Sequence, residues 1–410
     1  MKWNKSITAF LIAIFIDSLG WGVVYPVFSS LLIKDTTHIF PYANSIQLRD
    51  FWFELIIAIY CIFMFLSSPV LGSFSDKYGR KIMLMISLWG CSFGFVISAV
   101  GVSLNNIWLI IVGRIVSGAT AGSLAISQAA IMDIKHPSSK ALRLSWIGLA
   151  NGIGFACGPV LGGFMLDRSI WHVVHYSSAL WLTALLAAAG ALFVTFAFKE
   201  TFVGDRGQKV NILMGLQNIV SAFKTDTRFY CAAMLFFMLG WNMFFNEIPI
   251  FLDQRFLAQG STVGFFMAYV AIIFALSLLV LLPRILKKIT IEQLVLISLV
   301  MQFIFQVLFG LSQHWFLVWL IALPLVVAVP FTYVGVITQI SNLTAANHQG
   351  RIMGVVGSIV AFTWGLGPIV TGIVAKIHFT APYYITVTLE LIAFFMIVLQ
   401  LRKRGKSTLN

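Results

Sequence analysis

Charged residues are scarce in this sequence, and acidic residues are the scarcest of them. Only 10% of the 410 residues are Asp, Glu, Lys or Arg, while 60% are apolar. Soluble globular chains carry about 25% charged and about 45–50% apolar residues. Water is therefore not the main solvent of this chain, which excludes an ordinary soluble enzyme or binding protein.

Cysteine and metal-ligand patterns are also sparse. The four cysteines, Cys61, Cys91, Cys157 and Cys231, all fall in apolar segments without metal-ligand spacing. We therefore expect no disulfide framework and no metal site, and interpret the thiols as small core residues. The nucleotide-binding pattern G-x-x-x-x-G-K-[ST] is missing, so ATP is not the direct energy source. Because no nucleophile, base and orienting group occur together, we expect neither an enzyme nor a cofactor.

Long apolar segments fill most of the chain. Each is close to the roughly 20 residues that a helix needs to cross a bilayer, and none shows the alternation of a barrel strand. The sequence predicts an all-α membrane protein with twelve spans: Ile7–Ile33, Phe51–Phe74, Ile82–Val102, Ile107–Met132, Leu144–Leu166, Ser177–Phe198, Phe229–Leu252, Val263–Leu282, Leu294–Leu311, Trp315–Ile340, Ile352–Ala375 and Tyr383–Leu401.

Basic residues separate the spans and predict their orientation. The formal charge of +13 does not gather on one soluble face, so we expect no nucleic-acid partner. Most Lys and Arg residues fall on one side of the predicted spans, which the positive-inside rule makes the cytoplasmic side. Both termini are then cytoplasmic. The opposite side holds only these: Lys34, Arg49, Arg168, Arg255 and Lys376.

The chain divides into two similar halves. We predict a six-helix half over residues 1–198, a cytoplasmic linker over 199–228 and a second six-helix half over 229–410. Glycines and prolines of the fifth span recur at identical offsets in the eleventh: Gly148, Gly158, Pro159 and Gly163 correspond to Gly357, Gly367, Pro368 and Gly372. This echo indicates two copies of one unit, entering the membrane from the same side.

A charged turn follows the second span. It reads Gly72-Ser-Phe-Ser-Asp76-Lys77-Tyr-Gly79-Arg80-Lys81 and resembles the G-x-x-x-D-[RK]-x-G-R-[RK] signature of the major facilitator superfamily. From the residues alone, Gly79 permits a backbone that other residues resist, and Arg80 suits pairing with a carboxylate. Asp133, at the end of the fourth span, is the partner that we expect for Arg80.

Further segments share this resemblance. Gly154-x-x-x-Gly158-Pro159-x-x-Gly162-Gly163 is similar to the signature of the family's antiporters, and Asp17 with Pro26 is similar to its drug:proton subgroup. Lys199-Glu200-Thr201-Phe202 resembles the tetracycline-efflux type. That type carries acids in its third and ninth spans, which are absent here, so tetracycline itself is doubtful.

The resemblance implies the major facilitator fold, with two six-helix bundles that alternate access to a central site. We assign gating or coupling between conformations to the residues of the charged turn, to its expected partner Asp133 at the end of the fourth span, and to residues of the fifth span. These are Gly72, Asp76, Gly79, Arg80, Lys81, Asp133, Gly154, Gly158, Pro159 and Gly163. Read without the family, the glycines of the fifth span make a smooth stripe on which another helix packs.

Four ionisable residues lie well inside spans: Asp17, Arg114, Glu247 and Glu390. Each costs about 2.5–3.5 kcal/mol at mid-bilayer, so each requires a partner or a function. Desolvation favours a neutral carboxyl and a nearby cation favours an ionised one, so protonation and substrate binding would compete at Asp17. The alternative for Asp17 is a buried acid bonded to neighbouring hydroxyl groups or to Arg114, and the alternative for Arg114 is a static ion pair. We predict proton coupling through Asp17, Arg114 and Glu247, and a structural role for Glu390.

Polar and aromatic residues inside the spans are the candidates for substrate binding. They are Tyr25, Gln128, Asn151, Trp241, Asn242, Asn246, Gln302 and Gln306. For Glu247, in the polar patch of the seventh span, an acid wetted from the outer side is the alternative.

The sequence thus predicts a monomeric, multi-pass transporter of the bacterial inner membrane. Its partners are protons, membrane lipid and a small amphipathic organic compound, which it exports by proton-coupled antiport. Two alternatives stay open: proton-coupled import of a metabolite or siderophore, and a non-transporting receptor on a transporter fold.

Overall fold

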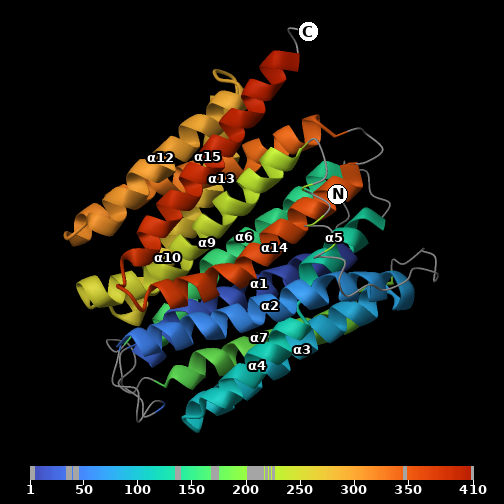
Figure 1. Cartoon of the computed structure of the whole chain (residues 1–410). Coiled ribbons are helices and arrows are strands. Elements are labelled where there is room, and N and C mark those ends of the chain that lie inside the picture. Colours follow the sequence, from blue (N-terminus) through green and yellow to red (C-terminus); the bar gives the residue numbers. More distant parts are fainter. Residues whose placement is uncertain are drawn as a thin grey trace. The chain divides into compact units, whose positions relative to one another are not determined.

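Most of the described residues are helical, and none of them forms a β-strand. A computed structural model describes residues 5–33, 39, 46–133, 140–167, 175–200, 217, 220, 223, 227–344 and 349–407. In chain order the helices are α1 (Lys5–Ile33), α2 (Ile46–Tyr78), α3 (Arg80–Ser103), α4 (Ile107–Ala119), α5 (Ser123–Asp133), α6 (Lys140–Met165), α7 (Tyr176–Ala197), α9 (Arg228–Phe256), α10 (Gly260–Leu276), η1 (Ser277–Leu281), α11 (Leu282–Ile285), α12 (Ile291–Leu311), α13 (Trp315–Asn342), α14 (Gln349–Val374) and α15 (Ala381–Ser407) (Figure 1).

The prediction of twelve spans is confirmed. Twelve helical segments of the described chain are long and apolar enough to cross a membrane. Several helices run past the predicted spans, as α2 does at both ends. The extensions of α2 carry charged residues, with Arg49 and Asp50 before the predicted span and Asp76 and Lys77 after it.

The fourth span was predicted as one continuous helix, but the structure divides it into two. It breaks between α4 and α5, where the Thr120 hydroxyl donates to the Val116 carbonyl at 2.9 Å and the backbone N–H of Gly122 donates to the Thr120 carbonyl at 2.9 Å. A side chain that bonds to the backbone competes with the helical ladder. Gly122 packs closely on Leu71 of α2, which fixes the break against a neighbouring helix.

The eighth span also departs from a regular helix. It passes from α10 through the π-helical turn η1 into α11, and the Leu282 N–H bonds to the Ser277 carbonyl five residues earlier. Pro283 follows directly. Proline has no N–H to donate and its ring crowds the carbonyl four residues back, so the preceding turn widens.

The helices form two compact units. Unit 1 comprises Met1–Leu213 and Ala258–Tyr269, and unit 2 comprises Met214–Leu257 and Val270–Asn410. The first turns of α10 therefore pack with the N-terminal helices. The predicted halves at 198 and 229 stay a prediction, because most of the linker lies outside the described residues.

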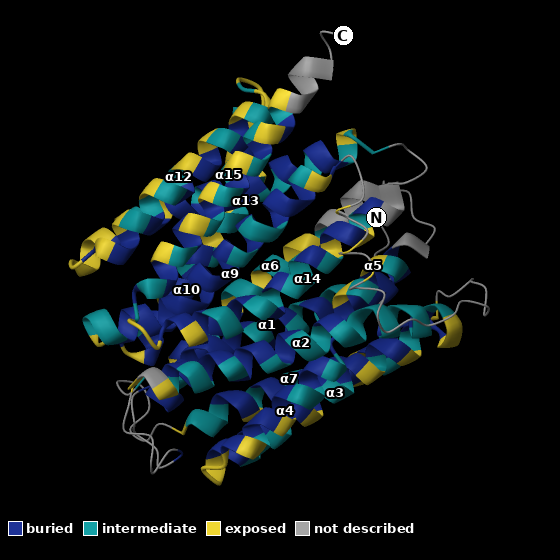
Figure 2. Cartoon of the chain, in the orientation of Figure 1, coloured by how far each residue is buried: buried dark blue, intermediate teal, exposed yellow. Residues whose placement is uncertain are grey.

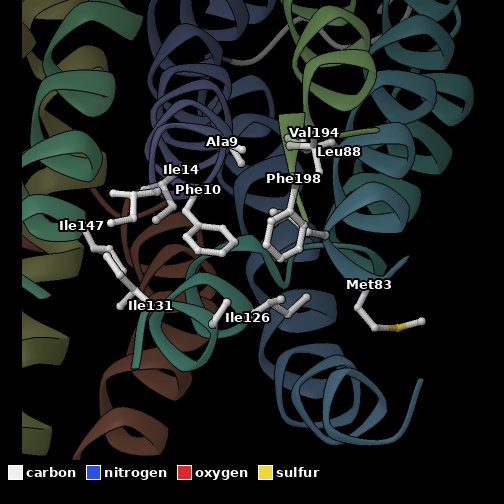
Figure 3. Packing of buried hydrophobic residues seen from close by; sticks show 14 of the residues in the cluster. Ala9, Phe10, Ile14, Met83, Leu88, Ile126, Ile131, Ile147, Val194 and Phe198 are labelled. Carbon is white, nitrogen blue, oxygen red and sulfur yellow. The ribbon is translucent and has the colours of Figure 1, made fainter. Parts of the chain in front are cut away.

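Unit 1 packs α1 against α6 and α7, α3 against α4 and α7, and α2 against α4. Its core cluster gathers side chains from α1, α2, α3, α5, α6 and α7 (Figure 3). At its centre the rings of Phe10 and Phe198 meet edge to face, with centroids 4.7 Å apart. This contact ties the start of α1 to the end of α7.

Unit 2 packs α9 against α14 and α15, and α12 against α13 and α15. Aromatic rings fill the junction of α9, α12 and α15. The centroids of Phe244 and Phe309 are 5.1 Å apart, and those of Phe251 and Tyr383 are 5.3 Å apart. Such edge-to-face pairs stabilise the contact beyond their buried area.

Large apolar side chains also cover the outside. Trp108, Phe196 and Phe316 are 66%, 85% and 75% exposed, and exposed residues run along the helices of both units (Figure 2). A surface this apolar is unfavourable in contact with water but suits contact with lipid. Cys157 is exposed as well. Its interpretation as a small core residue was wrong, whereas Cys61, Cys91 and Cys231 are buried as expected.

Candidate functional site

The charged turn between α2 and α3 depends on one glycine. Gly79 has φ of +106° and ψ of 149°, a conformation that is essentially restricted to glycine. Arg80 bonds through its guanidinium to Asp76 on the last turn of α2 and to the Ser75 hydroxyl at 2.6 Å. The predicted pairing with Asp133 stays untested, because that side chain lies outside the described residues. Arg80 thus ties the start of α3 to α2.

Glu200 closes this turn from the far end of the six-helix unit. Its carboxylate accepts the backbone N–H groups of Arg80 at 3.0 Å and of Lys81 at 3.1 Å. These are unpaired donors at the first turn of α3, where a negative charge is favourable. This role of Glu200 was not predicted. A carboxylate 120 residues away gives no local capping pattern.

The glycine stripe of α6 faces α1. A β-carbon at Gly154 would overlap the carbonyl oxygen of Phe15, and one at Gly158 would overlap that of Leu19. At Gly162 it would lie 2.8 Å from Pro26 Cγ. The four-residue repeat on both helices therefore brings the two backbones into contact.

The other face of the same segment contacts α10. Gly163 lies against the backbone of Ser261, where an added β-carbon would be 3.0 Å from Cα. A β-carbon at Gly264 would overlap the carbonyl oxygen of Pro159. Pro159 has no backbone N–H, so one hydrogen bond of the helix is missing here. Packing against α1 on one side and α10 on the other holds this part of α6 in place.

Asp17 lies halfway along α1 and is half-buried. Its neighbour Ser18 donates a hydrogen bond to Asn151 Oδ1 of α6 at 2.6 Å, so the predicted residue Asn151 lies beside this acid. In the described part of the chain, no ion pair or hydrogen bond joins Asp17 to Arg114. The static pair considered above is thus not present in this conformation.

Arg114 is buried in α4 and is only 1% exposed. Its guanidinium carbon lies 4.3 Å from the ring centroid of Tyr60 on α2. Among the described residues, Nε and Nη2 of Arg114 have no hydrogen-bond partner. Tyr60 and Cys91 lie within electrostatic range of both Arg114 and Asp17. A desolvated cation and a half-buried acid therefore flank the same two side chains.

Two further predicted residues of unit 1 lie in different environments. Tyr25 is completely buried in α1, and its ring centroid is 6.4 Å from that of Trp21. Gln128 is exposed on α5. Their part in substrate binding stays a prediction.

The polar patch of unit 2 lies on α9. Glu247, Asn242 and Asn246 are completely buried, and Asn242 donates to the Thr363 hydroxyl of α14 at 3.1 Å. Trp241 stacks on Phe244 at 5.7 Å. Burial means that Glu247 is not wetted in this conformation. The patch therefore gathers amides, an acid and an aromatic ring on one buried stretch of helix.

The two predicted glutamines of α12 bond to neighbouring helices. Gln302 donates to the Thr332 hydroxyl of α13 at 2.7 Å. Gln306 donates to Glu390 of α15 at 2.7 Å and accepts from the Thr386 hydroxyl at 2.8 Å. Glu390 is thus held between α12 and α15, and its structural role stays a prediction. Substrate binding by the glutamines stays a prediction.

The burial of Glu54 was not predicted. Glu54 of α2 is completely buried, and both carboxylate oxygens lack a hydrogen-bond partner among the described residues. It stands close to the start of the predicted span Phe51–Phe74, where an acid is expected to reach water. The continuation of α2 back to Ile46 places it inside the helix instead.

Twelve apolar helices that enclose buried acids and a buried guanidinium define a polytopic membrane transport protein. The sequence profile of the Major Facilitator Superfamily matches residues 10–329 and 230–410. The chain therefore belongs to this superfamily, and the predicted fold is confirmed.

Individual relatives cover nearly the whole chain. The chain is 26% identical over 384 residues to "Tetracycline resistance protein, class C" of Escherichia coli, covering 92% of this chain and 91% of the relative. It is 24% identical over 396 residues to "Multidrug resistance protein 1" of Bacillus subtilis (strain 168), covering 95% of each. The solved structure of a D-xylose-proton symporter matches with a TM-score of 0.74 at 15% identity, covering 95% of this chain and 97% of that one. This last likeness concerns the fold alone.

Proposed function

We propose that this chain is a secondary transporter that exports a small amphipathic organic compound in exchange for protons. The observation that carries the proposal is the arrangement of Asp17 and Arg114. A half-buried acid and a desolvated guanidinium flank Tyr60 and Cys91 without bonding to each other. Ionisable groups are energetically unfavourable in the hydrocarbon layer, and those that are kept there usually have a functional role.

The chemistry follows from competition at Asp17. A proton neutralises the carboxylate, and an approaching Arg114 side chain or a cationic substrate favours its ionised form. Binding of a proton to Asp17 and binding of substrate then exclude each other, as antiport requires. Arg114 keeps its charge throughout, because guanidinium does not lose its proton in proteins.

Export and substrate class are supported by the relatives' names, two of which refer to resistance to tetracycline or to several drugs. The missing acids of the third and ninth spans argue against tetracycline as the compound. In unit 2, Glu247 with Asn242, Asn246 and Trp241 is the second part of the proposed site. We place the protein as a monomer in a bacterial inner membrane with both termini in the cytoplasm.

Reconstituted transport tests this function. Purified protein in proteoliposomes should take up ethidium, or a member of a panel of lipophilic cations and neutral drugs, when an imposed pH gradient drives it. The Asp17→Asn variant should lose gradient-driven flux by at least about tenfold, because its amide cannot carry a proton. Glu292→Gln, a change at the first turn of α12 outside the proposed site, is the matched control.

Two results would reject the proposal. Flux across the panel that ignores the pH gradient in the wild type would remove the coupling. An Asp17→Asn protein that transports like the Glu292→Gln control would remove Asp17 from it.

A further inference from the structure

Glu54 of α2 is a buried acid for which the proposed exchange at Asp17 has no role. Its side chain is 0% exposed. Oε1 and Oε2 both lack a hydrogen-bond partner within the described residues, and no ion pair of Glu54 occurs there. Two unpaired carboxylate oxygens distinguish it from Glu390, which accepts a bond from Gln306.

The groups that face Glu54 come from α1, α2 and α4. On α2 itself, Asp50 lies one turn earlier and is 1% exposed. Tyr25 of α1 and Cys61 of α2 lie within electrostatic range of Glu54, and Arg114 of α4 lies within range of these same two residues. Among the described residues, Asp50 is the only charged group on α2 that acts directly on Glu54, and no cation does so.

In the described part of the chain, the other helices packed against α2 add no charge near Glu54. Cys91 of α3 has Asp17 and Arg114 as its electrostatic neighbours. Helix α5 carries no titratable residue before Asp133 at its end. The nearest cationic side chain on α2, Arg49, is directed at the Ile33 carbonyl of α1 at 3.5 Å.

This environment decides the protonation state. An ionised carboxylate with neither hydrogen bonds nor a counter-ion costs several kcal/mol when it is buried. The buried neighbour Asp50 is a second acid, so it does not compensate a negative charge on Glu54. The neutral, protonated form avoids this cost, so burial without a partner favours a proton on Glu54.

Position connects Glu54 with Asp17. On α1, Asp17, Trp21 and Tyr25 follow one another at four-residue intervals and therefore lie on one face. Eight residues of helix span about 12 Å, so Tyr25 and Asp17 mark two levels of the same face. Glu54 lies near Tyr25, and Tyr60 and Cys61 of α2 continue toward Arg114 and Asp17.

We propose that Glu54 is a second proton-carrying site, which passes protons between water at the Ile33 end of α1 and Asp17. This inference rests on the proposed function. The proton is taken from water by the Glu54 carboxylate and released to Asp17 through hydroxyl groups and water. No other reactant is consumed, and charge is conserved because one carboxyl gains the proton that the other loses.

Infrared difference spectroscopy of the full chain in lipid nanodiscs tests this site without a substrate. The wild-type spectrum minus that of Glu54→Gln should contain the carbonyl band of a protonated carboxylic acid. That band should vanish reversibly as the pH is raised, and should return when it is lowered. Glu390→Gln is the matched control, because its acid is equally buried but hydrogen-bonded, and its spectrum should keep the Glu54 band. Glu54→Asp should restore a shifted band.

The outcomes separate this site from the function on which it rests. A Glu54 band that is missing at every pH means an ionised side chain and overturns the proposal. A band that does not respond to pH means a fixed structural proton and overturns it as well. Failure of gradient-driven flux in wild type would overturn the proposed function and proton carriage together, while the titration would still report the protonation state. All variants must elute at the wild-type volume in size-exclusion chromatography.

Discussion

At the scale of single residues, Gly79 shows how one backbone angle fixes the charged turn. Its φ of +106° is available to glycine at little cost. Glu200 Oε2 also lies where a β-carbon would stand. The same residue therefore supplies both the turn and the room for the carboxylate that caps α3.

Replacement of Gly79 by alanine should destabilise the protein. We expect a loss of about 1–3 kcal/mol, because a side chain at this φ and ψ is strained and displaces Glu200 from its two N–H donors. Thermal unfolding in detergent, followed by tryptophan fluorescence, should show a lower midpoint. Gly72→Ala is the control, since a β-carbon there meets nothing within 4 Å. Equal midpoints for the two variants would contradict the assignment.

Sequence reasoning at this scale found the residues whose chemistry is conspicuous in an apolar context. Asp17, Arg114 and Glu247 stand out because few charges surround them in the chain. It missed Glu54 and Glu200, because each lies beside the end of a predicted span, where acids are ordinary. Only the three-dimensional contacts show that one is buried without a partner and that the other caps a distant helix.

At the scale of helices, the glycines of α6 have two different roles. Gly154 and Gly158 are in contact with the backbone of α1, whereas a β-carbon at Gly148 or Gly152 meets nothing within 4 Å. Sequence spacing predicted the stripe but not the helix that it faces. The matching glycine of α14, Gly367, faces α9 at Asn242, so the two copies of the repeat pack alike.

The contrast within α6 gives a paired prediction. Gly158→Ala should lower stability by about 1–3 kcal/mol, because the added methyl group forces α1 and α6 apart. Gly148→Ala should leave stability unchanged or raise it by about 0.5–1 kcal/mol, since alanine favours a helix. Unfolding midpoints measured in the same detergent decide. A Gly158→Ala protein as stable as Gly148→Ala would contradict the close packing.

Helix breaks were the part of the architecture that periodicity could not predict. Hydropathy reports only how many apolar residues follow one another, and it runs without interruption through Gly122 and through Ser277–Leu281. The breaks depend on a hydroxyl that bonds to its own backbone and on a proline that widens the turn before it. Both are local effects on hydrogen bonds, with little trace in hydrophobicity.

At the scale of the whole molecule, composition and span length predicted the fold correctly. Twelve crossings and membership of the Major Facilitator Superfamily agree with the charge-scarce sequence. The assignment of α10 was not foreseen, since its first turns belong to unit 1 while the chain on either side belongs to unit 2. The predicted halves followed the position of the linker in the chain, whereas the units are defined by contacts between helices.

The predicted orientation can be mapped by thiol labelling. In a background with the four native cysteines replaced by serine, Lys77→Cys and Lys287→Cys should react only with reagent on the cytoplasmic side. Asn105→Cys and Gln313→Cys should react only from the opposite side, because an even number of crossings separates the members of each pair. Removal of Cys157 is needed, since that thiol is exposed. Labelling of Lys77→Cys and Lys287→Cys from different sides would reject the topology.

The early turns of α10 have one more consequence. Gly260–Tyr269 lie against Pro159 and Gly163 of α6, yet they follow the linker in the chain. A gene cut within the linker would give a first fragment whose α6 lacks a contact that only the second fragment can supply. Fragment complementation should therefore succeed only when both pieces are made together, with each needed for the other to mature.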